Sequence, residues 1–315
     1  MKRTLLLTIF SLAVCGLHAG NILYVKAGAN GDGSSWSNAT GNLQQALQQA
    51  RFGDQIWVAT GKYYPTTSTD RNASFVITDG VKLFGGFAGY EPSIDDRNIS
   101  MNLTILSGEI GSPSIEDNSY TVVYTKNVSA ATVIDGFVIV GGSSNVTATK
   151  GDRKRCGAGW YNDGSNGVSN PVIRNCVFQN NYGRDGAALY NYAFNGTASP
   201  NISNCQFIAN RSDLDGGAIY NDAVNGVSSP QIENCSFERN EASYGAAILS
   251  VGTNGESMPV LISCHFVNNI AYIRSPNFHS VLEGAGICQA ITRNCQYIDS
   301  TVAKEQGSDM TEGKR

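Results

Sequence analysis

Short segments with a strand-like pattern recur along the second half of the chain. In Pro171-Val-Ile-Arg-Asn-Cys-Val-Phe178, the Ile, Cys and Phe positions are apolar, polar residues stand between them, and Asn and Pro mark the boundaries. Apolar positions with a period near two are typical of β-strands, whereas a helix would place them three and four residues apart. The pattern therefore predicts many short strands separated by turns.

The segments form a repeat that is marked by regularly spaced cysteines. The intervals are 29, 30, 29 and 31 residues in the series Cys176, Cys205, Cys235, Cys264 and Cys295. A fixed period of this length predicts a solenoid of stacked repeats. A second motif has the form Gly216-Gly-Ala-Ile-Tyr-Asn221, with copies starting at Gly157, Gly186 and Gly245 and a last copy expected at Gly284-Ala-Gly-Ile-Cys-Gln289.

Stacking of the repeats would place equivalent side chains in columns. Strands this short cannot bury a face alone, but parallel stacking at about 4.8 Å forms a continuous core. The sequence therefore predicts an all-β fold, a single-stranded parallel β-helix. Its columns would be an aromatic ladder (Phe178, Phe207, Phe237, Phe266, Tyr297), an aliphatic ladder (Ile173, Ile202, Ile232) and two asparagine ladders (Asn181, Asn210, Asn240, Asn269 and Asn162, Asn191, Asn221).

The chain before the regular repeats has less regular coils. The repeats begin at about residue 156, and residues 43–50 have the pattern of a short amphipathic helix. Because the first coil of a solenoid exposes its core, we expect this helix to cap the N-terminal end. We predict a β-helix domain over residues 20–300 and a polar C-terminal tail over residues 301–315.

The first 19 residues have the pattern of a secretory signal peptide. Lys2 and Arg3 precede an apolar run over 5–14, and Ala19 supplies the small residue expected at a cleavage site. We expect a mature chain that is secreted or lies at the outer cell surface, with no transmembrane segment. The formal net charge of -4 supplies no basic excess for phosphate contacts, which argues against nucleic-acid binding.

The motifs resemble those of known surface proteins. The pair Cys-x-Phe-x-x-Asn and Gly-Gly-Ala-Ile is similar to the repeats of chlamydial polymorphic outer membrane proteins. Segments such as Thr104-Ile-Leu-Ser-Gly108 and Ile134-Asp-Gly-Phe-Val-Ile-Val-Gly-Gly142 resemble secreted β-helix proteins of Bacteroidetes-type bacteria. The resemblance covers residues 21 to about 300. It implies a right-handed, pectin-lyase-like β-helix and surface display, and in the chlamydial case adhesion.

Two carboxylates are candidates for chemistry. The residues before each second-motif glycine form the column Cys156, Asp185, Asp215, Tyr244 and Glu283. Asp185 and Asp215 would lie one coil apart, about 5 Å, close enough to share a cation or a proton. Polysaccharide lyases of this fold hold calcium with solvent-facing carboxylates beside an Arg or Lys base, which makes this pair a candidate calcium site. The alternative is that both are turn residues that precede glycine.

Basic and aromatic side chains are candidates for ligand binding. Arg153 and Arg155 lie in a polar loop predicted over 145–155, and together with Arg184 they could bind an acidic sugar. The alternative is a solvated loop. The aromatic side chains that could either stack on sugar rings or pack over the coil are Tyr182, Tyr192 and Phe194.

The cysteine column is expected to hold free thiols. Equivalent residues on adjacent coils have parallel Cβ vectors, which strains the torsion of a disulfide, so buried thiols would act as small hydrophobes. Because the ladders are strong and no group of residues forms a clear catalytic constellation, the sequence favours an exported, non-catalytic β-helix that mediates adhesion or glycan binding without a cofactor. Its partner would be a polysaccharide or a host or cell-surface ligand. One alternative is a carbohydrate-active enzyme, either a calcium-assisted polysaccharide lyase or a glycoside hydrolase, and another is a purely structural surface or matrix component.

Overall fold

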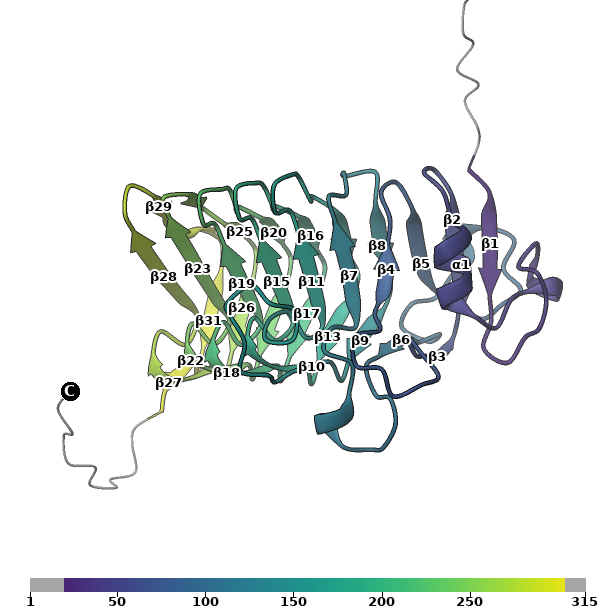
Figure 1. Ribbon diagram of the computed structural model, residues 1–315, viewed down its shortest axis with the longest axis horizontal. Helices are drawn as coiled ribbons and strands as arrows, with labels where there is room; N and C mark the ends of the chain where they lie inside the picture. Colours follow the sequence, from purple (N-terminus) through teal and green to yellow (C-terminus); the bar gives the residue numbers. More distant parts are fainter. Residues whose placement is uncertain (1–19, 304–315) are drawn as a thin grey trace, which may run out of the picture.

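Residues 20–303 are described by a computed structural model, and they form the right-handed parallel β-helix that the sequence predicts (Figure 1). From residue 143 onward each coil passes through four sheets in the order C, A, B and D, and equivalent strands of successive coils pair in parallel. Figure 1 shows the coils stacked along the long axis of the molecule, from the first coil at the right to the last at the left.

Sheets A and B run along most of the solenoid. Sheet A consists of β1 (Ile22–Val25), β2 (Gln55–Ala59), β5 (Lys82–Phe87), β8 (Val133–Asp135), β12 (Val172–Arg174), β16 (Asn201–Ser203), β20 (Gln231–Glu233), β25 (Val260–Ile262) and β30 (Ile291–Arg293). Sheet B consists of β3 (Gly61–Tyr63), β6 (Thr104–Ser107), β9 (Val138–Val140), β13 (Val177–Gln179), β17 (Gln206–Ile208), β21 (Ser236–Glu238), β26 (His265–Val267) and β31 (Gln296–Ile298).

Sheets C and D complete the coils. Sheet C consists of β4 (Phe75–Ile77), β7 (Val123–Lys126), β11 (Trp160–Asp163), β15 (Leu189–Tyr192), β19 (Ile219–Asp222), β23 (Ile248–Thr253) and β28 (Phe278–Glu283). Sheet D consists of β10 (Ser143–Ser144), β14 (Tyr182–Asp185), β18 (Arg211–Asp215), β22 (Glu241–Tyr244), β27 (Ile270–Arg274) and β32 (Thr301–Val302). A further pair is β24 (Glu256–Ser257) with β29 (Ile287–Cys288).

Left-handed backbone at the corners explains why asparagine recurs. A single residue with positive φ separates sheet A from sheet B in each regular coil, and asparagine adopts this conformation more readily than other residues with a Cβ. The residues at this corner are Asn175, Asn204, Asn234, Ser263 and Asn294, with φ between 51° and 54°. The corner between sheets B and D is made in the same way by Asn180, Ala209, Arg239, Asn268 and Asp299.

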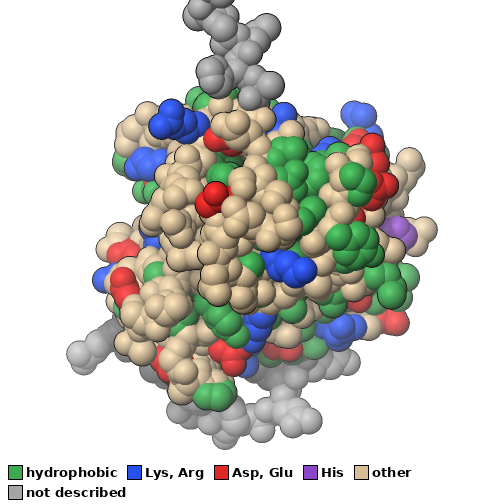
Figure 2. Space-filling view, turned by 90° about the vertical axis from the view of Figure 1, so that its right-hand side faces the viewer, with side chains coloured by type: hydrophobic (Ala, Val, Ile, Leu, Met, Phe, Trp, Pro, Cys, Tyr) green, Lys and Arg blue, Asp and Glu red, His purple; other side chains and the backbone are tan. Residues whose placement is uncertain are grey.

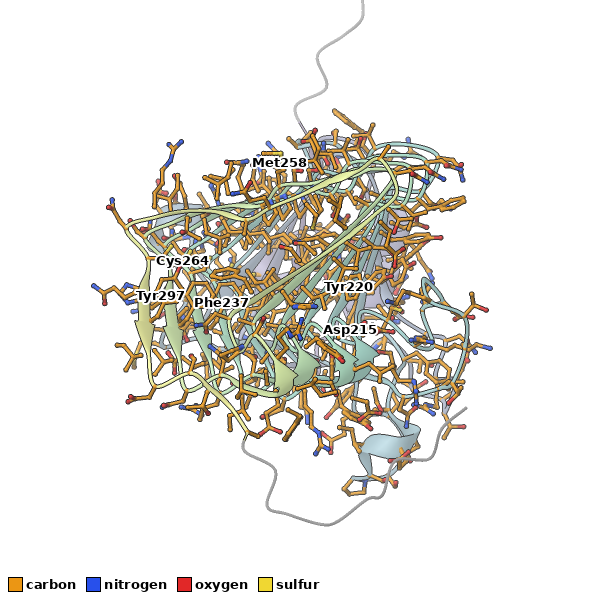
Figure 3. The ribbon with its side chains drawn as sticks, turned by 90° about the vertical axis from the view of Figure 1, so that its left-hand side faces the viewer. Asp215, Tyr220, Phe237, Met258, Cys264 and Tyr297 are labelled. Carbon is orange, nitrogen blue, oxygen red and sulfur yellow. The ribbon has the colours of Figure 1, made fainter. Side chains whose placement is uncertain are left out.

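The aromatic ladder fills the interior as predicted. Successive ring centroids from Phe178 to Tyr297 are 4.9, 4.8, 4.8 and 5.2 Å apart, and all four pairs are stacked. The isoleucine column is also confirmed, because Ile202 pairs with Ile173 and Ile232 in the sheet A register. Figure 3 shows Phe237, Cys264 and Tyr297 together on one side of the coil. Side chains at one repeat position therefore form a continuous apolar core.

Both asparagine ladders are present. From Asn181 to Asn269, each side-chain Nδ2 donates to the Oδ1 of the next coil at 3.0 Å. In the second ladder Asn162 donates to Asn191 at 3.0 Å and Asn191 donates to Asn221 at 2.9 Å. These side chains are buried, so the ladders satisfy polar groups that would otherwise be costly inside the coil.

The seven cysteines of the described chain are free, which confirms the free thiols predicted for the cysteine column. Cys176, Cys205, Cys235 and Cys264 are fully buried in the same core as the phenylalanines. Burial raises the pKa of the Cys205 thiol, which keeps it protonated. The column therefore acts as small apolar packing units.

A helix covers apolar residues near the N-terminal end, as expected. Helix α1 (Leu43–Gln49) begins after Asn42, whose Oδ1 accepts a hydrogen bond from the Gln45 backbone N–H at 3.0 Å. Leu43, Ala46 and Leu47 are buried in the main core. The other helical segments are the 3-10 turns η1 (Trp36–Asn38), η2 (Ile94–Asp96) and η3 (Ile115–Asp117).

The last expected copy of the second motif is wrong. Phe278, and not a residue after Gly284, pairs with Ile248 in sheet C. The preceding corner is made by Ser275, whose φ of 62° matches the 59° of Gly245 one coil earlier. Gly284 instead lies in the turn that leads from sheet C to sheet A. A serine takes the place of the corner glycine, so the sequence motif does not reveal that β28 follows it.

Two predicted segments lie wholly or partly outside the described residues. The predicted signal peptide, residues 1–19, is one of them, and residues 304–315 of the predicted tail are the other. Strand β32 contains the first two residues of that tail and pairs with β27. Between residues 20 and 303, no helix is long and apolar enough to cross a membrane.

Candidate functional site

A column of tyrosines lies on the outer face of sheet C. Tyr124, Tyr161, Tyr190 and Tyr220 are register partners on successive coils, with ring centroids 6.1, 5.4 and 4.9 Å apart. The last three are buried although they point away from the core, because the loop over residues 145–155 covers them. We call this segment the covering loop. It is held by Tyr161, whose hydroxyl donates to the Gly151 carbonyl at 2.6 Å.

The covering loop supplies a cation to Asp185. Asp185 ends β14 and is fully buried, and Arg155 Nε donates to its Oδ2 at 2.5 Å. The same guanidinium donates through Nη1 to the Ala148 carbonyl at 2.9 Å, which ties the loop to itself. Burial raises the pKa of Asp185, and Arg155 opposes that rise. Asp185 is therefore an internal ion-pair partner and does not face solvent.

Asp215 is the neighbour of Asp185 on the next coil, as predicted. Lys150 Nζ donates to Asp215 Oδ2 at 3.2 Å and to the Tyr220 hydroxyl at 2.8 Å. Figure 3 shows Asp215 and Tyr220 close together, on the side of the coil away from Phe237. Each of the two carboxylates thus has its own cation from the covering loop.

The predicted place of Glu283 in the column that contains Asp185 and Asp215 is wrong. Arg274, and not Glu283, is the register partner of Tyr244. Glu283 pairs with Thr253 in sheet C, because it follows the corner at Ser275 and so lies in the next strand, β28. In the described part of the chain, no group of three or more His, Cys, Asp or Glu side chains is placed to hold a metal ion. Calcium needs six to eight oxygen ligands, so Asp185 and Asp215 with their cations do not fit it.

The three arginines proposed to bind an acidic sugar have different neighbours. Arg155 pairs with Asp185, as described above. Arg153 Nη2 donates to Ser74 Oγ at 2.9 Å, and its guanidinium lies 4.2 Å from the centroid of the Tyr124 ring. Arg184 lies in β14 of sheet D, and its Nε is buried without a hydrogen-bond partner. The structure brings one of these arginines to a candidate carboxylate and leaves the other two apart from it.

Asp222 is a buried carboxylate that the sequence did not single out. It is 2% exposed, and the Tyr190 hydroxyl donates to its Oδ2 at 2.5 Å. Its Oδ1 is buried and has no hydrogen-bond partner. The signal in the sequence was the Tyr-Asn-Asp order in β19, which puts Tyr220 and Asp222 on one outer face.

Asp222 should make stability depend on pH. Burial raises its pKa above the ordinary value of 3.8, so just above that pH the unfolded chain has released this proton and the folded chain has kept it. The free energy of unfolding therefore falls as the pH rises from about 3.8 to the pKa of the folded state. We expect Asp222→Asn to remove this fall, so that the variant gains stability relative to the wild type between about pH 4 and about pH 7.

Urea denaturation followed by circular dichroism at the two pH values measures this difference. Asp95→Asn, in the exposed turn η2, is the matched control and should retain the pH dependence of the wild type. An equal stability difference between wild type and Asp222→Asn at both pH values would contradict the prediction.

A solvent-facing groove lies at the corner between sheets B and D, where β14 and β18 begin. It has a volume of about 400 Å³ and is lined by Ile115, Glu116, Asn180, Asn181, Tyr182, Ala209 and Arg211. We call it the sheet D groove. The Tyr182 hydroxyl donates to both carboxylate oxygens of Asp213, at 2.9 and 3.0 Å. Partial burial and Asp213 raise the pKa of Tyr182, so its phenol stays protonated and its ring is held in place.

The other two aromatic candidates pack over sheet C. Tyr192 is half-buried, and its ring lies 5.9 Å from that of Tyr161 and 6.2 Å from that of Tyr190. Phe194 stacks on Tyr192 with a centroid distance of 6.2 Å and is 36% exposed. Of the aromatic residues that the sequence left undecided, Tyr182 is the one that lines a groove.

Comparison with known proteins gives a likeness of fold. No protein-family model matches the chain, and no curated protein matches it. Among solved structures, the crystal structure of pectate lyase Pel9A is similar, with 11% sequence identity and a TM-score of 0.37. The matched region covers 86% of this chain and 79% of that one. At this identity the likeness says nothing about what this chain binds or does.

Proposed function

We propose that the protein is a non-catalytic β-helix that binds glycan through the sheet D groove. One observation carries the proposal: the exposed groove is built around the ordered ring of Tyr182, whereas Asp185 is closed beneath the covering loop and Asp215 is paired with Lys150. The groove is open to a large ligand, whereas Asp185 has no exposed surface and the Asp215 side chain is 21% exposed and paired with Lys150.

The state of the acids argues against hydrolysis or elimination at Asp185 and Asp215. A carboxylate that acts on a glycosidic bond must contact the sugar, and a hydrolase needs two such groups on opposite sides of that bond. Asp185 is fully buried against Arg155, and Asp215 binds Lys150. Both carboxylates thus serve to hold the covering loop.

The groove offers the contacts that a sugar requires. A tyrosine ring provides a flat apolar surface for the CH face of a pyranose, and charged planar groups bond to its hydroxyls. Arg211 is exposed and lies on the coil after Tyr182, with its guanidinium 6.0 Å from the ring centroid. Glu116 also lines the groove and accepts a hydrogen bond from Asn145 at 2.7 Å.

Polar side chains continue along sheet D beyond the groove. Glu241 follows Arg211 in the register, and its Oε2 accepts a hydrogen bond from the Tyr272 hydroxyl at 2.5 Å. Strands β10, β18, β22 and β27 succeed one another along the lower side of Figure 1. An extended ligand could therefore contact several coils, which suits a surface that binds polymers.

Export and surface association belong to the same proposal. The signal peptide pattern over residues 1–19 and the resemblance of the repeats to those of chlamydial and Bacteroidetes-type surface proteins support them. In this proposal the partner is a polysaccharide or a host or cell-surface ligand.

We expect the purified chain to be retained by an immobilised polysaccharide. Replacement of Tyr182 by alanine should weaken this binding roughly 10-fold, because the variant loses the aromatic surface of the groove. The purified chain would be passed over immobilised acidic and neutral polysaccharides, with calcium and with chelator. Retention, unsaturated-product absorbance and reducing ends would be read together. We expect retention without product under both conditions.

Tyr90→Ala is the matched control, since Tyr90 is 78% exposed and lies outside the groove. This variant should be retained like the wild type. Product formation that is lost in Asp185→Asn or Asp215→Asn would overturn the non-catalytic proposal. If Tyr182→Ala were retained as strongly as the wild type, the binding surface would not be the sheet D groove.

A further inference from the structure

A second cavity lies in the N-terminal cap, far along the chain from the sheet D groove. It has a volume of about 580 Å³ and lies between the start of α1 and the segment that follows β3. Residues that line it include Asn42, Leu43, Tyr64, Pro65 and Thr67, and we call it the Tyr64 cavity. Its volume is within the roughly 300–1,000 Å³ of sites that bind small molecules.

Tyr64 is shared between this cavity and a smaller one. The smaller cavity, about 270 Å³, lies beside residues 109–113, and Tyr64, Thr66 and Thr67 line both. The Tyr64 side chain is 45% exposed. An exposed aromatic ring between two hollows can be covered by a ligand that is longer than one sugar ring. The hydroxyl and amide groups nearby can bond to the ligand while the ring contacts its CH face.

The charges at this site balance one another. Lys62 Nζ lies 5.4 Å from the centroid of the Tyr64 ring and forms an ion pair with Glu109. The hydrogen bond that Lys62 donates to Glu109 raises the pKa of Lys62, so the ammonium group persists. Figure 2 shows that the N-terminal end is mainly uncharged surface with scattered charged side chains. A site with one compensated cation gives little advantage to an anionic ligand.

We propose that the Tyr64 cavity binds the end of a neutral glycan, with one sugar ring against Tyr64. Asn42, Thr67 and the pair of Lys62 and Glu109 would bond to its hydroxyls. This site is separate from the sheet D groove. Two separate sites on one rigid solenoid would also raise the avidity for a polymer that reaches both of them.

Binding of short saccharides tests the site. The probes would be cellobiose, maltose, lactose and mannobiose, with glucuronate and digalacturonate as anionic probes. Saturation-transfer NMR would detect binding to the full chain, and titration would give the dissociation constant. We expect at least one neutral disaccharide to bind, and Tyr64→Ala to weaken it at least 10-fold. Tyr90→Ala, which changes another exposed tyrosine, should leave the dissociation constant unchanged.

A second variant tests the charge argument without removing the ring. Glu109→Gln leaves Lys62 uncompensated, and both side chains are about two-fifths exposed, so the variant should fold. We expect it to bind glucuronate or digalacturonate at least 5-fold more tightly than the wild type does. An unchanged preference in Glu109→Gln, or tighter binding of an anionic probe than of every neutral one by the wild type, would overturn the proposal.

The two sites can be separated in the same experiments. Loss of disaccharide binding in Tyr64→Ala with normal polysaccharide retention supports the cap site and leaves the sheet D groove standing. Disaccharide binding that depends on Tyr182 and not on Tyr64 would overturn the cap site only. Absence of disaccharide binding in the wild type would also overturn the site at the Tyr64 cavity. The polysaccharide retention assay would then test the sheet D groove independently.

Discussion

Replacement of Arg155 by alanine should lower the free energy of unfolding by about 3–5 kcal/mol, because it leaves a buried charge without a partner. Asp185 has no exposed surface, and Arg155 Nε is the donor to its Oδ2. Its other carboxylate oxygen is already buried without a partner, and the remaining side-chain donor to Oδ2 is the weak Cys156 thiol at 3.9 Å, which carries no charge to replace the guanidinium. Urea denaturation at neutral pH, followed by circular dichroism, measures the loss.

A double-mutant cycle with Asp185→Asn identifies the cause. The asparagine side chain carries no charge, so the double variant should be more stable than Arg155→Ala alone. Arg239→Ala is the control for loss of a surface arginine, because Arg239 is 58% exposed and its ion pair with Glu238 spans 3.7 Å. Exposed pairs of this kind are worth about 0–1 kcal/mol. Equal costs for Arg155→Ala and Arg239→Ala would show that the ion pair does not hold the covering loop.

The repeat made the interior of the solenoid predictable. Once the cysteines fix the length of a coil, every residue has a defined partner one coil away, and the phenylalanine and asparagine columns follow from that register alone. The structure confirms both columns, with stacked rings and with amide hydrogen bonds of 3.0 Å. The adjacency of Asp185 and Asp215 follows from the same rule and is also confirmed.

Features that depend on segments outside the repeat were not predictable. The covering loop has no counterpart in other coils, so nothing in the sequence indicated that Lys150 would reach Tyr220 or that Arg155 would reach Asp185. The Tyr64 cavity joins α1 to residues after β3, which are distant in sequence. Periodicity predicts contacts between equivalent positions, and these contacts join positions that are not equivalent.

The misplaced motif at Gly284 shows a second limit. The corner between sheets D and C requires positive φ, and glycine usually supplies it, so a glycine in the sequence predicts this corner. In the last full coil Ser275 adopts that conformation with φ 62°, and Gly284 serves a different turn. The strand register defines the corner, and the residue type does not. Because Gly284 does not mark this corner, Glu283 does not lie in the column of Asp185 and Asp215.

Phe207→Ala should lower the free energy of unfolding by about 3–5 kcal/mol, because the cavity it creates cannot collapse. Phe207 has no exposed surface and stacks between Phe178 and Phe237, at 4.9 and 4.8 Å. The backbone on both sides is fixed by parallel pairing with two neighbouring coils, which prevents the rings from closing the gap. The loss should appear in urea denaturation as a lower midpoint.

The position of a ring in the ladder should determine the cost of its removal. In a solenoid each coil interacts mainly with its two neighbours, so an interior ring loses two stacking partners and a ring at the end loses fewer. Tyr297 is the last member of the ladder and is 48% exposed. Tyr297→Ala should therefore cost at most about half as much as Phe207→Ala. Phe207→Leu fills most of the space and should cost about 1–1.5 kcal/mol. Equal costs at Phe207 and Tyr297 would mean that burial within the stack does not stabilise the solenoid, and the columns would then reflect the repeat of the sequence without an energetic role.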